Sequence, residues 1–305
     1  MGNIPEVESY NVYGEETGVY ATPPGTVTSH FGLIQNSRAR IKNQYQGYKG
    51  IGAGLNDRQI SAAGLLDTGI GFTFQVFNAD FLKYVLGSVS GAGSVGDPYV
   101  YAEANTLPSL TIEDAYNLDT DQVLRFIGSV AARMTIRCSL GKPVEVDLEF
   151  NSYDVTKSNT YQSITVPSTD LFTFIHGSCE LPSGSALTEI QECTITVDLK
   201  LSRHGGIGGR KGTVKVQGRS YSGNYKKLIN DGVGMEDAMG GTTTTSSGTP
   251  AKQATLRLNL TDGSRYIYLT INDVYADWES DKAVGNPSNE NITFEALSAG
   301  AVEVV

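Results

Sequence analysis

Histidine, cysteine and tryptophan are scarce in this chain, which has three histidines, three cysteines and one tryptophan among 305 residues. The histidines are scattered at His30, His176 and His204, and no His or Cys pair has the spacing of a zinc site. The Gly-x-Ser-x-Gly sequence of serine hydrolases and the Gly-Lys-Ser or Gly-Lys-Thr sequence of phosphate-binding loops are also missing. We therefore expect no catalytic residues, no metal and no cofactor.

Three cysteines are too few for a disulfide framework, which fits synthesis in a reducing compartment. They are Cys138, Cys179 and Cys193. Because Cys138 alternates with Met134 and Ile136, we expect it to fill a core position as a small apolar side chain.

Long apolar runs and an excess of basic charge are also missing. No run approaches the roughly 18–20 apolar residues that cross a bilayer. Glu6 and Glu8 follow Met1–Pro5 without a basic segment and an apolar one, so no secretory signal and no membrane partner are expected. With 23 basic and 33 acidic residues, the net charge is −10. This argues against tight binding of nucleic acid, which needs Lys and Arg at the phosphates, but not against nucleic acid passing nearby.

Glycine is abundant, with 35 residues, and Thr, Ser, Val, Tyr and Phe are frequent. Such a composition favours β-structure with glycine-rich turns. Apolar and polar residues alternate in several segments, which predicts strands at Gly71–Phe77, Glu192–Ser202, Leu256–Leu260 and Tyr266–Ile271, with a turn at Asp262-Gly263. Short helices are predicted at Asn78–Leu86 and Glu113–Asn117. Strands do not alternate with long helices, so a parallel α/β sheet is not expected.

The sequence contains an internal repeat, since several short segments recur at nearly the same offset. Ile34-Gln35 and the glycine run Gly50–Gly54 recur as Ile190-Gln191 and Gly206–Arg210, and Gly64 and Gly69 recur as Gly218 and Gly223. No amphipathic helix follows either glycine run, so both are better explained as turns than as phosphate cradles. The repeat predicts two diverged copies of one module, at residues 31–165 and 166–305.

Residues 1–30 form a separate segment, with scattered prolines and tyrosines and no sustained period. They predict an extended arm that lies against another subunit, and a disordered terminus is the alternative. The candidate contact residues are Tyr10, Tyr13 and Tyr20.

Two long segments rich in Gly, Ser and Thr occupy matching places in the two copies, at Ser88–Asn105 and Asp231–Lys252. Loops of this length are usually functional or disordered. Their matching places favour a shared contact role, and an insertion tolerated twice is the alternative. The candidate contact residues are Asp97, Tyr99, Thr243 and Thr244.

The most regular hairpin spans Val130–Asn151, with a turn at Leu140–Pro143. Its second strand carries Glu145, Asp147 and Glu149 on one face. A turn centred near Gly141 would place Arg137 opposite Glu145 and Arg133 opposite Glu149, as cross-strand pairs. The acidic row is consistent with a solvated polar face, with the lining of a lumen or, least of all, with a metal site, since metal ligands usually converge from several elements.

The order of several segments resembles that in the major tail tube proteins of long-tailed bacterial and archaeal viruses. The segments are Gly64–Gly87, Phe126–Val130, Ser139–Phe150, and Leu171–Ser178 leading to Gln191. The resemblance implies a mainly β fold, with two tandem β-sandwich or barrel modules, short helices and long inter-ring loops. It also implies a structural protein of the virion tail, made in the host cytoplasm, that assembles into stacked rings around a channel for viral DNA.

Three two-module chains would supply the six modules of a pseudo-hexameric ring. By the same resemblance, the other partners are the tape measure, tail terminator and baseplate proteins, and DNA transits without specific binding. Two alternatives remain open: a hub or baseplate ring protein, and a β-sandwich carbohydrate- or receptor-binding virion protein, whose sugars the 16 tyrosines would stack against.

Overall fold

The computed structural model describes residues 9–48, 60–116, 122–158, 160, 170–180, 186–187, 189–207, 209–228, 253–262, 264–281, 289–300 and 302–305. Strands dominate these residues, with one α-helix, α1 (Phe81–Leu86), and one 3-10 turn, η1 (Phe174–His176). All pairings between the described strands are antiparallel and join into one large sheet. The mainly β fold is therefore confirmed.

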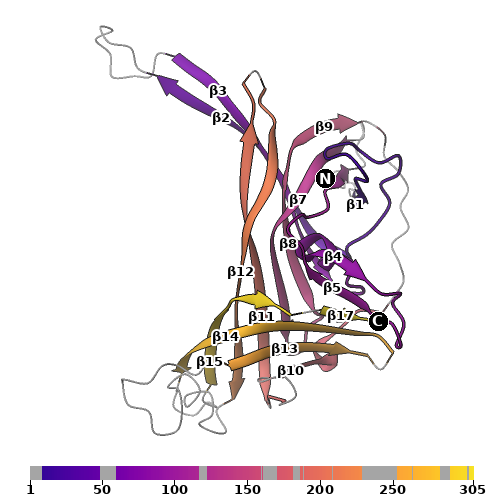
Figure 1. The fold of residues 1–305 in the computed structure, drawn as a ribbon, viewed down its shortest axis with the longest axis vertical. Coiled ribbons are helices and arrows are strands. Elements are labelled where there is room, and N and C mark those ends of the chain that lie inside the picture. The colour runs from indigo at the N-terminus through magenta and orange to yellow at the C-terminus, as the bar shows by residue number, and fades with distance from the viewer. Residues whose placement is uncertain are drawn as a thin grey trace, which may run out of the picture.

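The longest part of this sheet, here called the central sheet, contains eight strands from both halves of the chain (Figure 1). In spatial order they are β2 (Leu33–Tyr48), β3 (Ile60–Gln75), β8 (Glu145–Ser152), β7 (Gln122–Ser139), β11 (Ile190–Gly205), β12 (Gly212–Leu228), β15 (Asn289–Ala296) and β14 (Tyr266–Asp281). The β2–β3 hairpin projects from the body of the molecule. The described residues 206–207 and 209–211 lie between the paired strands β11 and β12, where a turn is predicted, whereas Gly50–Gly54 lies outside the described residues.

Two strands of the central sheet continue into smaller sheets. The first part of β7 pairs with β6 (Leu110–Tyr116) and β9 (Asp154–Ser158), and β6 pairs with β1 (Ser9–Glu15). The first part of β14 pairs with β13 (Gln253–Thr261), β16 (Ser298–Ala299) and β17 (Val302–Val304), while β13 pairs with β10 (Gly177–Glu180). From β17 the pairing continues to β5 (Tyr99–Glu103) and β4 (Gly87–Ser90).

The hydrophobic core lies against one face of the central sheet. Alternate residues of each strand point to this face, as the period of a strand requires. Phe72, Leu148 and Met134 from neighbouring strands are fully buried there, and Ile195 and Ile292 continue the same layer. The buried side chains of both halves form one contiguous cluster, so the two halves share a core. The division at residues 31–165 and 166–305 stays a prediction.

Two predictions for residues 78–117 have different outcomes. The helix at Asn78–Leu86 is confirmed as α1, but the helix at Glu113–Asn117 is wrong because Glu113 lies within strand β6. Both faces of β6 are buried, so its sequence lacks the alternation that reveals a strand. The segment Ser88–Asn105 is largely the β4–β5 hairpin, whereas Asp231–Lys252 lies outside the described residues.

The described part of the N-terminal segment packs within its own subunit. The Tyr13 ring stacks on Phe31 with the centroids 4.0 Å apart, and Tyr10 and Tyr13 are both buried. The Tyr20 hydroxyl donates to the carbonyl of Gly128 at 3.1 Å. Residues 9–30 are thus held by intrachain contacts, which the prediction of an extended arm did not foresee. A contact of these tyrosines with another subunit stays a prediction.

A buried carboxylate fixes this segment where β7 passes from one sheet to the next. Glu16 accepts hydrogen bonds from the Ser109 and Thr111 hydroxyls, each at 2.7 Å, and from the backbone N–H groups of Ala21 and Gly128, each at 2.8 Å. Gly128 has a φ of +61°, which favours glycine. A Cβ there would lie 2.8 Å from the Cβ of Tyr153.

We predict that Gly128→Ala lowers the free energy of unfolding by about 1–3 kcal/mol through backbone strain, with a further loss from the clash. Chemical denaturation followed by circular dichroism measures this. Gly141→Asn is the matched control, since Gly141 also has a positive φ but open space around its Cα. Equal midpoints for the Gly128→Ala variant and the unaltered protein would contradict the assignment.

Candidate functional site

The face of the central sheet opposite the core is polar across all eight strands. We call it the polar face. One row of paired residues crosses it through Asn36, Thr73, Asp147, Thr135, Thr196, Ser222, Glu295 and Tyr275. Such a surface is broad and mostly hydrogen-bonding. It is hollowed at two places, with a volume of about 210 Å³ beside Arg38 and Glu149 and of about 410 Å³ beside Asn224 and Glu279.

The predicted acidic row lies on this face. Arg137 is opposite Glu145 and Arg133 is opposite Glu149, in the register that the sequence predicts. The closest ion pair of the row, however, comes from β2, where the Arg38 guanidinium lies 2.6 Å from Asp147 and 3.9 Å from Glu149. Exposed pairs of this kind contribute about 0–1 kcal/mol each.

The junction between β7 and β11 joins the two halves of the central sheet. Arg133 lies 3.4 Å from Asp198 across it, and the hydroxyls of Thr135 and Thr196 are 3.1 Å apart. Both residues of the ion pair are about half exposed, so this pair aligns the strands more than it stabilises them. The ion pairs Arg38–Asp147 and Arg133–Asp198 were not predicted, because the two residues of each pair lie on strands that are distant in the sequence.

The central sheet has two free edges in the described chain, β2 at one end and the second part of β14 at the other. Apolar side chains are exposed along both edges. Ile41 is 45% exposed and Tyr45 is 62% exposed on β2, and Tyr275 is 43% exposed on β14. Free edges of this length present unpaired backbone groups, which other strands readily pair with.

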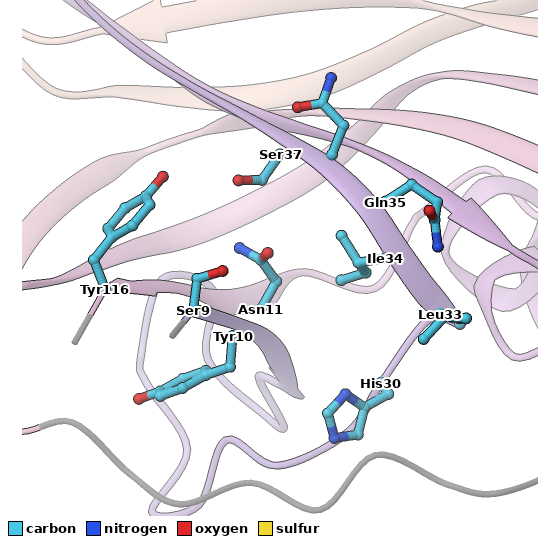
Figure 2. A pocket seen from close by; sticks show the side chains of 11 residues that line it. Ser9, Tyr10, Asn11, His30, Leu33, Ile34, Gln35, Ser37 and Tyr116 are labelled. Atoms are coloured by element: carbon cyan, nitrogen blue, oxygen red, sulfur yellow. The ribbon is translucent and has the colours of Figure 1, made fainter. Parts of the chain in front are cut away.

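A pocket of about 440 Å³ opens along the lower part of the free β2 edge (Figure 2). Its walls come from β1, β2 and β6, and Ser9, His30, Ile34 and Tyr116 line it. Beside it, Asp114 is buried and accepts hydrogen bonds from Asn11 at 2.6 Å, Ser37 at 3.2 Å and Tyr116 at 3.1 Å. Three donors satisfy this carboxylate, so it ties the base of β2 to the neighbouring sheet.

The candidate contact residues of the long segments lie apart from this face. Asp97 and Tyr99 are at the tip of the β4–β5 hairpin, where the Asp97 carbonyl accepts from the N–H groups of Ala92 and Ser94, each at 3.1 Å. Thr243 and Thr244 lie outside the described residues. Within the described ranges, no group of His, Cys, Asp or Glu side chains has the geometry of a metal site. No helix in those ranges is long and apolar enough to span a membrane.

The sequence model of a family described as phage tail tube protein matches residues 12–296. The chain belongs to this family. It is a structural, non-enzymatic protein of the phage tail and hence of the virion, and its family implies self-assembly together with other tail proteins. Among curated proteins, none matches the chain.

The three cysteines of this tail tube protein gather beside the junction. Cys193 on β11 lies directly opposite Cys138 on β7. These two residues and Cys179 line a cavity of about 230 Å³. Cys179 and Cys193 are buried and Cys138 is partly buried. Cys138 packs against the core, where it was predicted to lie, and its partial burial raises the pKa of its thiol to about 11.

We predict that these thiols react slowly with iodoacetamide at pH 8 in the folded protein and quickly after denaturation, because the thiolate is the reactive form. The raised pKa means that unfolded chains lose the Cys138 proton first as the pH rises. The protonated Cys138 thiol therefore contributes to the free energy of unfolding below about pH 9, and this contribution is lost as the pH rises from 9 to about 11. Mass spectrometry of labelled peptides measures the rates, and equal rates in both states would contradict the prediction.

Proposed function

We propose that three copies of this chain form a ring, that each copy contributes two modules to it, and that stacked rings enclose a channel for viral DNA. The membership of the chain in the phage tail tube family supports the tube. The observation that carries the stoichiometry is a repeated pattern of strand pairing.

The pairing pattern of the first half recurs in the second half. In the first half, the strands pair in the order β2, β3, β8, β7 and β6. In the second half, they pair in the order β11, β12, β15, β14 and β13. Each series begins with a long hairpin and has the same connections, which is the pattern that two copies of one module would have.

One detail strengthens this correspondence. The first hairpin has a register shift between Ile34 and Asn36, and the second has one between Ile190 and Glu192. Bulges are specific features that related structures keep. The repeated glycines do not correspond: Gly69 pairs with Asn151 on the polar face, whereas Gly223 lies on the core face between the buried Tyr221 and Tyr225.

The correspondence also explains the free edges. β7 and β11 pair inside the chain. The counterpart of β7 is β14 and the counterpart of β11 is β2, and among the described residues each of these two has a free edge. A head-to-tail contact between free edges of successive copies closes into a ring when the rotation fits. Closure would remove these two free edges, which otherwise invite uncontrolled association. Three copies would then surround the channel with six modules.

The polar face would line this channel. Glu145, Asp147 and Glu149 lie on it, and Arg38 neutralises part of their charge. A lining with little excess basic charge would let DNA pass without holding its phosphates.

The exposed tips and the N-terminal segment would serve the contacts between subunits and rings. Asp97 and Tyr99 would meet the next ring, and Tyr10, Tyr13 and Tyr20 would hold the segment that reaches a neighbour. Tape measure, tail terminator and baseplate proteins are the partners that the tail position implies.

Electron microscopy of the purified protein tests the assembly. We expect long hollow filaments whose rings have three copies of the chain, with pseudo-sixfold modulation. Rings that never stack would instead favour a hub or baseplate protein. A small oligomer whose melting temperature rises with glycans would favour a carbohydrate-binding protein.

A charge-reversed lining tests the channel surface. Glu145→Lys with Glu149→Lys should leave the melting temperature nearly unchanged, because both side chains are on a solvated face, and should slow DNA ejection from assembled virions. Asp170→Lys, which reverses one exposed charge outside the central sheet, is the matched control. Ejection kinetics equal to those of this control would remove the two glutamates from the lining.

A further inference from the structure

The two free edges of the central sheet carry opposite charge on the polar face. β2 presents Arg38, Arg40 and Lys42, and β14 presents Asp277 and Glu279. Lys42, Asp277 and Glu279 are exposed, and the part of the chain that the structure describes supplies none of the three with an ion-pair partner. Arg38 and Arg40 also have partners within the chain, Asp147 at 2.6 Å and Asp67 at 3.4 Å. The opposite sign of the charge at the two ends of one sheet indicates that these ends meet in different copies of the chain.

The β7–β11 junction gives the register in which they would meet. One row of the core face runs through Phe72, Leu148 and Met134, and continues across the junction to Val197. The corresponding row of the second half runs through Tyr225, Ile292 and Trp278, and ends at the free edge of β14. Trp278 therefore holds the place of Met134.

The matching bulges fix the other strand. Ile34 and Ile190 hold the same place before the register shift in their hairpins. Ile41 follows Ile34 by the same number of residues as Val197 follows Ile190, so Ile41 on β2 corresponds to Val197 on β11. Trp278 of one copy would then lie opposite Ile41 of the next, as Met134 lies opposite Val197 within the chain.

The same register brings the charges together. Arg133 and Asp198 face each other at the internal junction, 3.4 Å apart. Their counterparts at the free edges are Asp277 and Lys42, with the signs exchanged. Thr135 and Thr196 likewise correspond to Glu279 and Arg40.

We propose that β14 of one copy pairs antiparallel with β2 of the next copy in this register, with Asp277 against Lys42 and Glu279 against Arg40. This junction rests on the proposed ring, and it names the contact that closes it. Antiparallel pairing with complementary charges also sets the direction of the ring, because β14 against β14 and β2 against β2 are both repulsive.

Apolar side chains on the core face of both free edges are incompletely covered, as the proposed junction requires. Met134 and Val197 are almost fully buried at the internal junction, whereas Ile41 is 45% exposed and Trp278 is only partly buried. Pairing the free edges would cover both side chains. Burial of apolar area would then supply the attraction, and the ion pairs would select the register.

Cysteine pairs test the register in the full-length chain. With Lys42→Cys and Asp277→Cys in one chain, directly opposite residues come within disulfide range, so mild oxidation of assembled protein should give covalent oligomers on a denaturing gel. Arg38→Cys with Asp277→Cys is the matched control, because the two residues would be several positions out of register and should not cross-link. Both variants keep the native cysteines.

Charge reversal tests the pairs themselves. Asp277→Lys with Glu279→Lys should require a roughly tenfold higher protein concentration for assembly, because two attractions become repulsions. Adding Arg40→Glu and Lys42→Glu to that variant should restore assembly. Glu295→Lys, on the polar face of the neighbouring strand β15, is the control, and thermal melting verifies that each variant folds.

The outcomes separate this junction from the proposed ring. The junction is supported if residues 42 and 277 cross-link and residues 38 and 277 do not, and if assembly is lost in the Asp277→Lys with Glu279→Lys variant and recovered when Arg40→Glu and Lys42→Glu are added. Two results would overturn the junction but keep the tube. In the first, tubes form but residues 42 and 277 do not cross-link. In the second, the Asp277→Lys with Glu279→Lys variant assembles as well as the Glu295→Lys control. If the charge-reversed chain does not fold, the cysteine pair decides by itself. An unaltered chain that never forms rings overturns the proposed function, and the junction with it.

Discussion

Strand β7 is hydrogen-bonded on both of its edges, and the rest of the fold depends on this ladder. Its first part pairs with β6 and β9, and its second part pairs with β8 and β11. Through these pairings, one strand connects the N-terminal residues, the first long hairpin and the second half of the chain. The change of partners occurs near Gly128, whose positive φ and hydrogen bond to Glu16 hold the backbone at the point where it leaves one sheet for the other.

The same ladder links the fold to its role in a tail tube. Among the described residues, the backbone groups inside the central sheet are paired, and the outer edges of β2 and of the second part of β14 are unpaired. One face of the sheet packs on a core that both halves share, and the other is polar. A sheet with one polar face and two free edges of opposite charge is suited to closing around an aqueous channel, because closure pairs the backbone groups of the edges and leaves the polar face in water.

Individual elements show how far the sequence could predict this structure. In the hairpin from Val130 to Asn151, the predicted register near the turn is confirmed, because the alternation and the turn are local signals. The register shift between Ala131 and Arg133 was not predicted. The helix predicted at Glu113–Asn117 was wrong because β6 is buried on both faces and so has no alternation. The packing of Tyr10 and Tyr13 in their own subunit, and the pairing of Arg38 with Asp147, could not be foreseen. Both depend on which distant strands become neighbours.

The amino-acid sequence by itself determined the strand pattern, the absence of enzymatic motifs and the family resemblance that the family match confirmed, since each of these rests on residue type and short spacing. Only the tertiary structure decided that β7 pairs with β11, that no other described strand pairs with the outer edges of β2 and the second part of β14, and that the charges of these edges have opposite sign on the same face. The physical reason is that strand pairing joins residues far apart in the chain, and the hydrogen bonds that choose the partner are made by the backbone, which is nearly the same for every residue.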